Sequence, residues 1–123
     1  MEQLRALQPG ERLTLSVSAS GSEWSGVTNM IGALYQLVDN GQVCSGLVNG
    51  AAPRTAVGLK RDGSLVLYTI DGRQSGYSIG ATLTQVAQRM VELGCVTALS
   101  LDGGGSTALV ATQPDSTTAS LVN

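Results

Sequence analysis

A chain of 123 residues, 42% hydrophobic and 13% charged, has the size and composition of one globular domain and not of an intrinsically disordered protein. Its formal net charge of −2 excludes the basic stripe that binds a nucleic-acid backbone, so no nucleic-acid partner is expected. No apolar stretch approaches the ~18 residues that cross a bilayer, so no membrane span is expected either.

The chain contains no histidine, which removes several classes of active site. Ser-His-Asp triads, Cys-His dyads and His-rich zinc sites all need an imidazole. Cys44 and Cys95 match neither a CxxC redox pair nor a zinc knuckle, and they permit at most one disulfide. Any chemistry must therefore use carboxylates, Arg, Lys, hydroxyl groups and backbone amides. No metal site and no cofactor are predicted, while assistance by calcium stays open.

The first expected elements are a strand and a hairpin. Residues 13–17 (LTLSV) alternate apolar and polar side chains, the pattern of a half-buried strand. Residues 34–38 and 42–44 are two short strand-like runs joined by Asp39-Asn40-Gly41. Asn-Gly supplies the positive φ angles of a tight turn, so the two runs are predicted to form a β-hairpin.

A second hairpin is predicted further along the chain. Residues 55–60 and 64–70 are rich in β-forming side chains and are joined by Arg61-Asp62-Gly63. We interpret Asp62 as a turn residue, because Asp-Gly is a common turn dipeptide. The run LVLYTI is apolar enough to predict a central strand.

Between residues 82 and 94 the apolar pattern changes to the period of a helix. Thr82 is a suitable N-cap and Gly94 a suitable left-handed residue after the last turn. One face of this helix carries the apolar side chains Leu83, Val86, Ala87, Met90 and Leu93. Two further strands are expected at residues 96–101 and 107–111.

The order of these elements predicts the fold class. The succession strand, helix, strand between Leu65 and Leu101 suggests a crossover connection with those two strands parallel. The fold is therefore α/β (α+β), a mixed β-sheet with one principal helix, in a single domain over residues 1–123.

Two loops are expected at one edge of that sheet. If the two strands are parallel, Asp71-Gly72-Arg73 and residues 102–106 (DGGGS) both leave carboxyl ends, where open α/β sheets bind ligands. The triple glycine lets backbone N–H groups approach a ligand. Asp102 directly follows an apolar strand, and for this residue we favour a functional role over a turn role.

The same edge offers a site for an anion. Residues 74–80 lead into the predicted helix N-terminus, where free N–H groups and the helix dipole favour negative charge. Arg73 lies at the start of this segment, and Arg54 precedes the strand that is expected to pair with residues 65–70, so two guanidinium groups could clamp a phosphate. The alternative for either arginine is a solvated surface charge.

Four blocks in this order resemble the phosphodiester glycosidase family. They are PRTAVG at 53–58, VLYTIDGRQSGYSIG at 66–80, VELGC at 91–95 and ALSLDGGGST at 98–107. The family includes the uncovering enzyme, which removes N-acetylglucosamine from phosphomannose tags, and bacterial members associated with the cell envelope. The resemblance implies a hydrolase that cleaves the glycosidic bond of a sugar-1-phosphodiester, like a phosphodiester alpha-N-acetylglucosaminidase.

The resemblance also implies site residues. Asp71 and Asp102 are the expected catalytic carboxylates. The expected substrate and phosphate contacts are Arg54, Thr55, Gly72, Arg73, Ser78, Gly103, Gly104, Gly105, Ser106 and Thr107, with Arg73 added from its position beside the first loop.

Family members carry an upstream Asn-Gly-aromatic block and a downstream final strand that we do not find here. The chain is therefore expected to be a central portion of the family's catalytic domain. Unprotected sheet edges would then allow a homo-oligomer.

Three functions fit the sequence. The first is hydrolysis of a sugar phosphodiester or glycopolymer, with the parent protein expected outside the cell or in the cell envelope, acting on an exopolysaccharide-like substrate. The second is a module that binds an envelope glycopolymer without cleaving it. The third is a structural fragment that gains missing strands from another chain.

Overall fold

The computed structural model describes residues 8–14, 16, 24 and 26–123, and it separates the chain into two units, 1–30 and 31–123. In the first unit the backbone turns at Gln8, whose carbonyl accepts from the Glu11 N–H at 3.1 Å. The strand predicted at 13–17 includes positions 15 and 17, which lie outside the described residues; positions 13, 14 and 16 are not in a strand. Among the described residues, no helix combines the length and apolarity that a membrane crossing requires.

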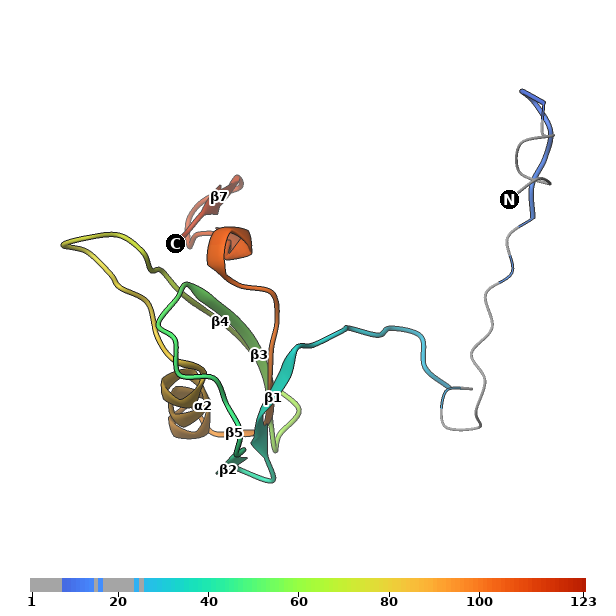
Figure 1. Ribbon diagram of the computed structural model, residues 1–123. Helices are drawn as coiled ribbons and strands as arrows, with labels where there is room; N and C mark the ends of the chain where they lie inside the picture. Colours follow the sequence, from blue (N-terminus) through green and yellow to red (C-terminus); the bar gives the residue numbers. More distant parts are fainter. Residues whose placement is uncertain (1–7, 15, 17–23, 25) are drawn as a thin grey trace. The chain divides into compact units, whose positions relative to one another are not determined.

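The second unit contains a five-stranded sheet with the strand order β2-β1-β5-β3-β4 (Figure 1). Every hydrogen-bonded pair of neighbours in this sheet is antiparallel. The strands are β1 (Tyr35–Asp39), β2 (Gln42–Val43), β3 (Arg54–Lys60), β4 (Leu65–Ile70) and β5 (Cys95–Ser100).

Both predicted hairpins are confirmed. In the β1–β2 hairpin Asp39 pairs with Gln42, and the two turn residues Asn40 and Gly41 have φ angles of 49° and 77°. In the β3–β4 hairpin the Asp62 carboxylate accepts from the Ser64 N–H at 2.9 Å. This hydrogen bond lowers the pKa of Asp62. Asp62 is thus the turn residue that its dipeptide predicted.

Strands β4 and β5 run in the same direction, because each is antiparallel to β3. The two strands that the sequence predicted to be parallel therefore share a direction but are not neighbours, because β3 pairs with both of them. The α+β class with one principal helix is confirmed. The predicted shared edge is also confirmed. The carboxyl ends of β4 and β5 lie at the same edge of the sheet, and the first residue of β3 lies between them.

The prediction that LVLYTI is a central strand is wrong. This run forms β4, an edge strand, with Leu65 and Leu67 exposed on one face and Val66, Tyr68 and Ile70 directed to the core. An apolar run signals burial on both faces. One face of β4 packs against the core. Because Leu65 and Leu67 lie on the other, exposed face, the apolar sequence wrongly predicted a strand buried on both faces.

Helix α2 (Leu83–Glu92) begins and ends where the sequence predicts. The Thr82 hydroxyl accepts from the Gln85 N–H at 3.2 Å, and the Gln85 side chain accepts from the Thr82 N–H at 2.9 Å. This reciprocal pair is a capping box. Gly94, with a φ of 85°, follows the helix in the left-handed region.

The core lies between α2 and one face of the sheet (Figure 1). Gly58 of β3 allows this close approach, because a Cβ there would lie 2.5 Å from Cys95 Sγ and 2.6 Å from Met90 Cε. Burial also raises the pKa of the Cys95 thiol, and both cysteines are free. The core consists of Leu37, Val38, Ala56, Ala81, Leu83, Val86, Ala87, Met90, Cys95 and Ala98.

Gly58→Ala is expected to lower the free energy of unfolding by about 1–3 kcal/mol, the usual cost of overpacking a dense core. Denaturant titration measures the change, with Gly32→Ala as the control, because a Cβ at Gly32 meets nothing within 4 Å. A change below ~0.5 kcal/mol is expected for that control. Equal stability of the two variants would contradict the close helix approach.

The strand predicted at 107–111 lies slightly further along the chain. A short 3₁₀-helix, η2 (Gly104–Ser106), follows β5, and β6 (Val110–Thr112) pairs with β7 (Ala119–Leu121) in a separate two-stranded sheet. Strand β7 was not predicted. With only three residues, β7 is too short to show a periodic pattern, and polar residues precede it.

Candidate active site

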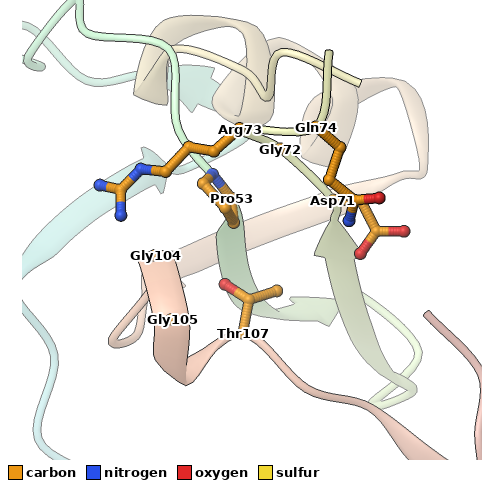
Figure 2. A pocket seen from close by; sticks show the side chains of 8 residues that line it. All are labelled: Pro53, Asp71, Gly72, Arg73, Gln74, Gly104, Gly105 and Thr107. Carbon is orange, nitrogen blue, oxygen red and sulfur yellow. The ribbon is translucent and has the colours of Figure 1, made fainter. Parts of the chain in front are cut away.

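A cavity of about 260 Å³ opens where β4 ends (Figure 2). This volume is just below the usual range for small-molecule sites. The lining residues come from the two predicted loops, from the residue after each loop and from the residue before β3. They are Pro53, Asp71, Gly72, Arg73, Gln74, Gly104, Gly105 and Thr107.

The direction of the strands brings the two loops together. Since β3 starts between the carboxyl ends of β4 and β5, the loops close over its first residues. The Gly104 N–H donates to the Pro53 carbonyl at 2.9 Å, and the Leu101 N–H donates to the Thr55 carbonyl at 3.0 Å. The Thr55 hydroxyl also donates to the Thr107 hydroxyl at 3.4 Å. These bonds fix the glycine-rich loop against the start of β3.

Asp71 is the first residue after β4, and contacts hold both its backbone and its side chain. The Ser78 hydroxyl donates to the Asp71 carbonyl at 2.6 Å. The Asn123 side-chain amide donates to the Asp71 carboxylate at 2.9 Å. The carboxylate is thus oriented at the cavity wall, and Ser78 acts on the loop backbone.

Arg73 lines the other side of the cavity. Its φ of 57° lies in the left-handed region, which costs energy for a residue with a side chain. A Cβ placed on Gly104 would lie 3.4 Å from Arg73 Nη1, so the glycine leaves room for the guanidinium. Figure 2 shows the Arg73 guanidinium and the Asp71 carboxylate on opposite sides of Pro53. A cation and a carboxylate therefore flank one opening.

Arg54 does not line this cavity. Its Nε donates to the Ala81 carbonyl at 3.1 Å, and its Nη2 donates to the Gly50 carbonyl at 2.5 Å. The structure therefore does not bring Arg54 and Arg73 together around one opening. These contacts tie the segment before β3 to the residue that precedes the N-cap of α2.

Asp102 is exposed and is also absent from the cavity lining. Its carboxylate accepts from the Gly103 N–H at 2.9 Å. The N–H groups of Ser106 and Thr107 donate to carbonyls of the same loop, at 3.1 and 3.3 Å. Together with the Gly104 bond to Pro53, these contacts use backbone donors that were expected to face a ligand.

Two residues beside the cavity, Pro53 and Asn123, were not predicted, and Gln74 was named only as part of the segment 74–80 that leads into the helix. Pro53 and Gln74 adjoin predicted site residues, so adjacency alone could have found them. Asn123 follows β7, an element without a sequence signal. In the part of the chain that the structure describes, no three His, Cys, Asp or Glu side chains are grouped to hold a metal ion.

Residues 2–123 match the family model described as phosphodiester glycosidase, and the chain belongs to that family. The resemblance seen in the four sequence blocks is thereby confirmed.

Curated relatives match about half of the chain. The human N-acetylglucosamine-1-phosphodiester alpha-N-acetylglucosaminidase is 39% identical over 66 residues, which cover 54% of this chain and 12% of that protein. A prophage-derived uncharacterized protein of Bacillus subtilis, YomE, is 44% identical over 59 residues, covering 48% of this chain and 9% of YomE. The chain thus spans a small part of the length of these relatives.

Two solved structures share the fold. One is the zebrafish N-acetylglucosamine-1-phosphodiester alpha-N-acetylglucosaminidase catalytic domain, auto-inhibited by its pro-peptide, with a TM-score of 0.55 and 28% identity. It matches 63% of this chain and 31% of the zebrafish chain. A hypothetical protein from Synechocystis matches with a TM-score of 0.53 and 33% identity, over 63% of this chain and 16% of its own.

Proposed function

We propose that this chain carries the carboxylate and phosphate-binding parts of a hydrolase that cleaves the glycosidic bond of a sugar-1-phosphodiester. One observation carries the proposal: in a member of the phosphodiester glycosidase family, the Asp71 carboxylate and the Arg73 guanidinium flank one cavity. A substrate with a phosphodiester beside Arg73 and an anomeric carbon beside Asp71 would place its scissile bond between them. The natural substrate is then a sugar phosphodiester or a glycopolymer.

The proposed reaction breaks the bond between the anomeric carbon and the phosphodiester oxygen. The electron pair of that bond leaves with the oxygen, which becomes part of a phosphomonoester anion, and an oxocarbenium-like centre develops on the sugar. Arg73 stabilises the charge on the leaving phosphate. Because a phosphate is a good leaving group, this stabilisation matters more than protonation.

Asp71 acts on the anomeric carbon in this proposal, either as the nucleophile or as the base that takes a proton from water. Asp102 is the second carboxylate, and it meets the substrate outside the cavity lined by Asp71. Water supplies the hydroxyl group of the free sugar, and its proton leaves with the base. The first-formed anomer, followed by proton NMR, distinguishes retention, through a nucleophile, from inversion, through a base.

Hydrolysis in ¹⁸O-labelled water tests which bond breaks. Cleavage between carbon and oxygen puts no label into the phosphomonoester, whereas cleavage between phosphorus and oxygen puts one ¹⁸O atom there. Mass spectrometry of the phosphate product reads the difference. Labelled phosphate would contradict the proposed glycosidase, and binding without turnover would favour the glycopolymer-binding alternative.

Arg73→Lys is expected to weaken binding of a sugar-1-phosphodiester by about tenfold, although the charge is kept, because the planar fork that holds two phosphate oxygens is lost. Titration calorimetry measures the affinity. Arg54→Lys is the matched variant: its guanidinium is bonded to two carbonyls, so it should mainly lower the melting temperature. If only Arg54→Lys weakened binding, Arg54 and not Arg73 would be the phosphate-binding arginine.

We propose the cell envelope or the extracellular space as the setting of the whole protein, because the family to which the chain belongs includes bacterial members associated with the cell envelope. A homo-oligomer through the edge strands β2 and β4 remains part of this proposal. Sedimentation of the chain in dilute buffer tests the oligomer, and a monomer would remove it.

A further inference from the structure

Asn123 makes the contact that best explains how the Asp71 carboxylate is held at the cavity wall. Its side-chain oxygen accepts from the Leu109 N–H at 2.6 Å, just before β6. Its side-chain nitrogen donates to the Asp71 carboxylate at 2.9 Å and to the Thr107 carbonyl at 3.5 Å. One half-buried amide thus joins the end of β7, the start of β6 and the loop after β4.

These partners fix the orientation of the amide group. The Leu109 N–H is a donor and requires the oxygen of Asn123. The Asp71 carboxylate accepts hydrogen bonds and requires the nitrogen. A flipped amide would place oxygen against carboxylate oxygen and NH₂ against N–H, so only one orientation satisfies both partners.

We propose that Asn123 is a positioning residue for Asp71. The amide holds the carboxylate in one rotamer by a hydrogen bond to a charged acceptor, which is shorter and stronger than a neutral one. Leu109, through its N–H, holds the amide in turn. This inference rests on the proposed role of Asp71 and adds that the segment following the β6–β7 hairpin contributes to the site through Asn123.

Two variants separate positioning from a purely structural role. Asn123→Asp keeps an oxygen for the Leu109 N–H and replaces the donor by a second carboxylate facing Asp71. Asn123→Ala removes all three hydrogen bonds of the side chain but adds no charge. A positioning role predicts the larger loss of kcat in Asn123→Asp, about 10- to 100-fold with KM nearly unchanged, because a misplaced reacting group costs rate more than binding.

A purely structural role predicts the opposite order, since Asn123→Ala loses the bond that closes the hairpin and Asn123→Asp keeps it. A greater loss of kcat in Asn123→Ala, together with a lower melting temperature, would therefore overturn the proposal. Ser120→Ala, an exposed change in β7, is the control and should leave kcat unchanged.

A second readout is independent of hydrolysis. The side-chain amide signals of Asn123 in ¹H–¹⁵N NMR should shift in Asp71→Asn, because the charged acceptor is lost. Unchanged signals would overturn the positioning role even if the wild-type chain were active. Shifted signals in a chain that hydrolyses no sugar phosphodiester would sustain the Asn123–Asp71 contact while the proposed function failed.

Discussion

Asp71→Asn is expected to lower kcat/KM for a sugar-1-phosphodiester by at least ~10²-fold, the low end for losing a nucleophile or a general base. Asparagine keeps the size of the side chain, and its oxygen still accepts from Asn123. The melting temperature should therefore change little. Steady-state kinetics and thermal unfolding of the same preparation measure the two quantities.

Asp62→Asn is the matched control for this variant. Asp62 lies in the β3–β4 turn and is exposed, and asparagine can replace its bond to the Ser64 N–H. Activity should be that of the wild type. If Asp71→Asn were as active as Asp62→Asn, the carboxylate at the cavity wall would have no part in the reaction.

Asp102→Asn is the second variant with a large expected effect, again at least ~10²-fold in kcat/KM. Asparagine retains the acceptor for the Gly103 N–H, so the loop and the melting temperature should be preserved. Loss of activity at constant stability would support a second carboxylate, as glycoside hydrolysis ordinarily uses.

Two outcomes would remove Asp102 from the reaction. Full activity of Asp102→Asn would show that Asp102 is not needed, and Asp71 would then be the one proposed catalytic carboxylate left in this chain. Unfolding of the variant would identify Asp102 as a turn residue of the glycine-rich loop. The Asp102 side chain is exposed and bonds to the next residue, so its substitution by asparagine disturbs the loop less than a deletion of the loop would.

The local elements of the fold could be predicted because their signals lie within a few residues. Asn40-Gly41 determines its turn through positive φ angles, and Thr82 with Gln85 forms the capping box of α2. The position of β4 could not be predicted in this way. Whether an apolar strand becomes central depends on which strands pair with it, and the pairing of β3 with β5 is a contact between distant segments.

Part of the site followed from the predicted direction of two strands. Asp71, Arg73 and Gly104 meet at one cavity because β4 and β5 both end beside the start of β3. The position of the Arg54 side chain could not be predicted in the same way. Its side chain donates to the carbonyls of Gly50 and Ala81, and those carbonyls belong to irregular segments whose path has no periodic signal.

The placement of β3 between β4 and β5 also affects how the cavity is assembled during folding. The β3–β4 hairpin joins neighbouring segments, so it can form early, but it supplies only the loop that bears Asp71. The cavity wall at Gly104 forms only when β3 pairs with β5. In that pairing Ala56 lies opposite Ser100, and the whole of α2 separates the two residues in the sequence. Contacts of such high sequence separation form slowly because loop closure costs entropy. After dilution from denaturant, the rate at which phosphodiester binding returns would therefore report the rate of this long-range pairing. Spectroscopic signals of the β3–β4 hairpin should return earlier than binding does.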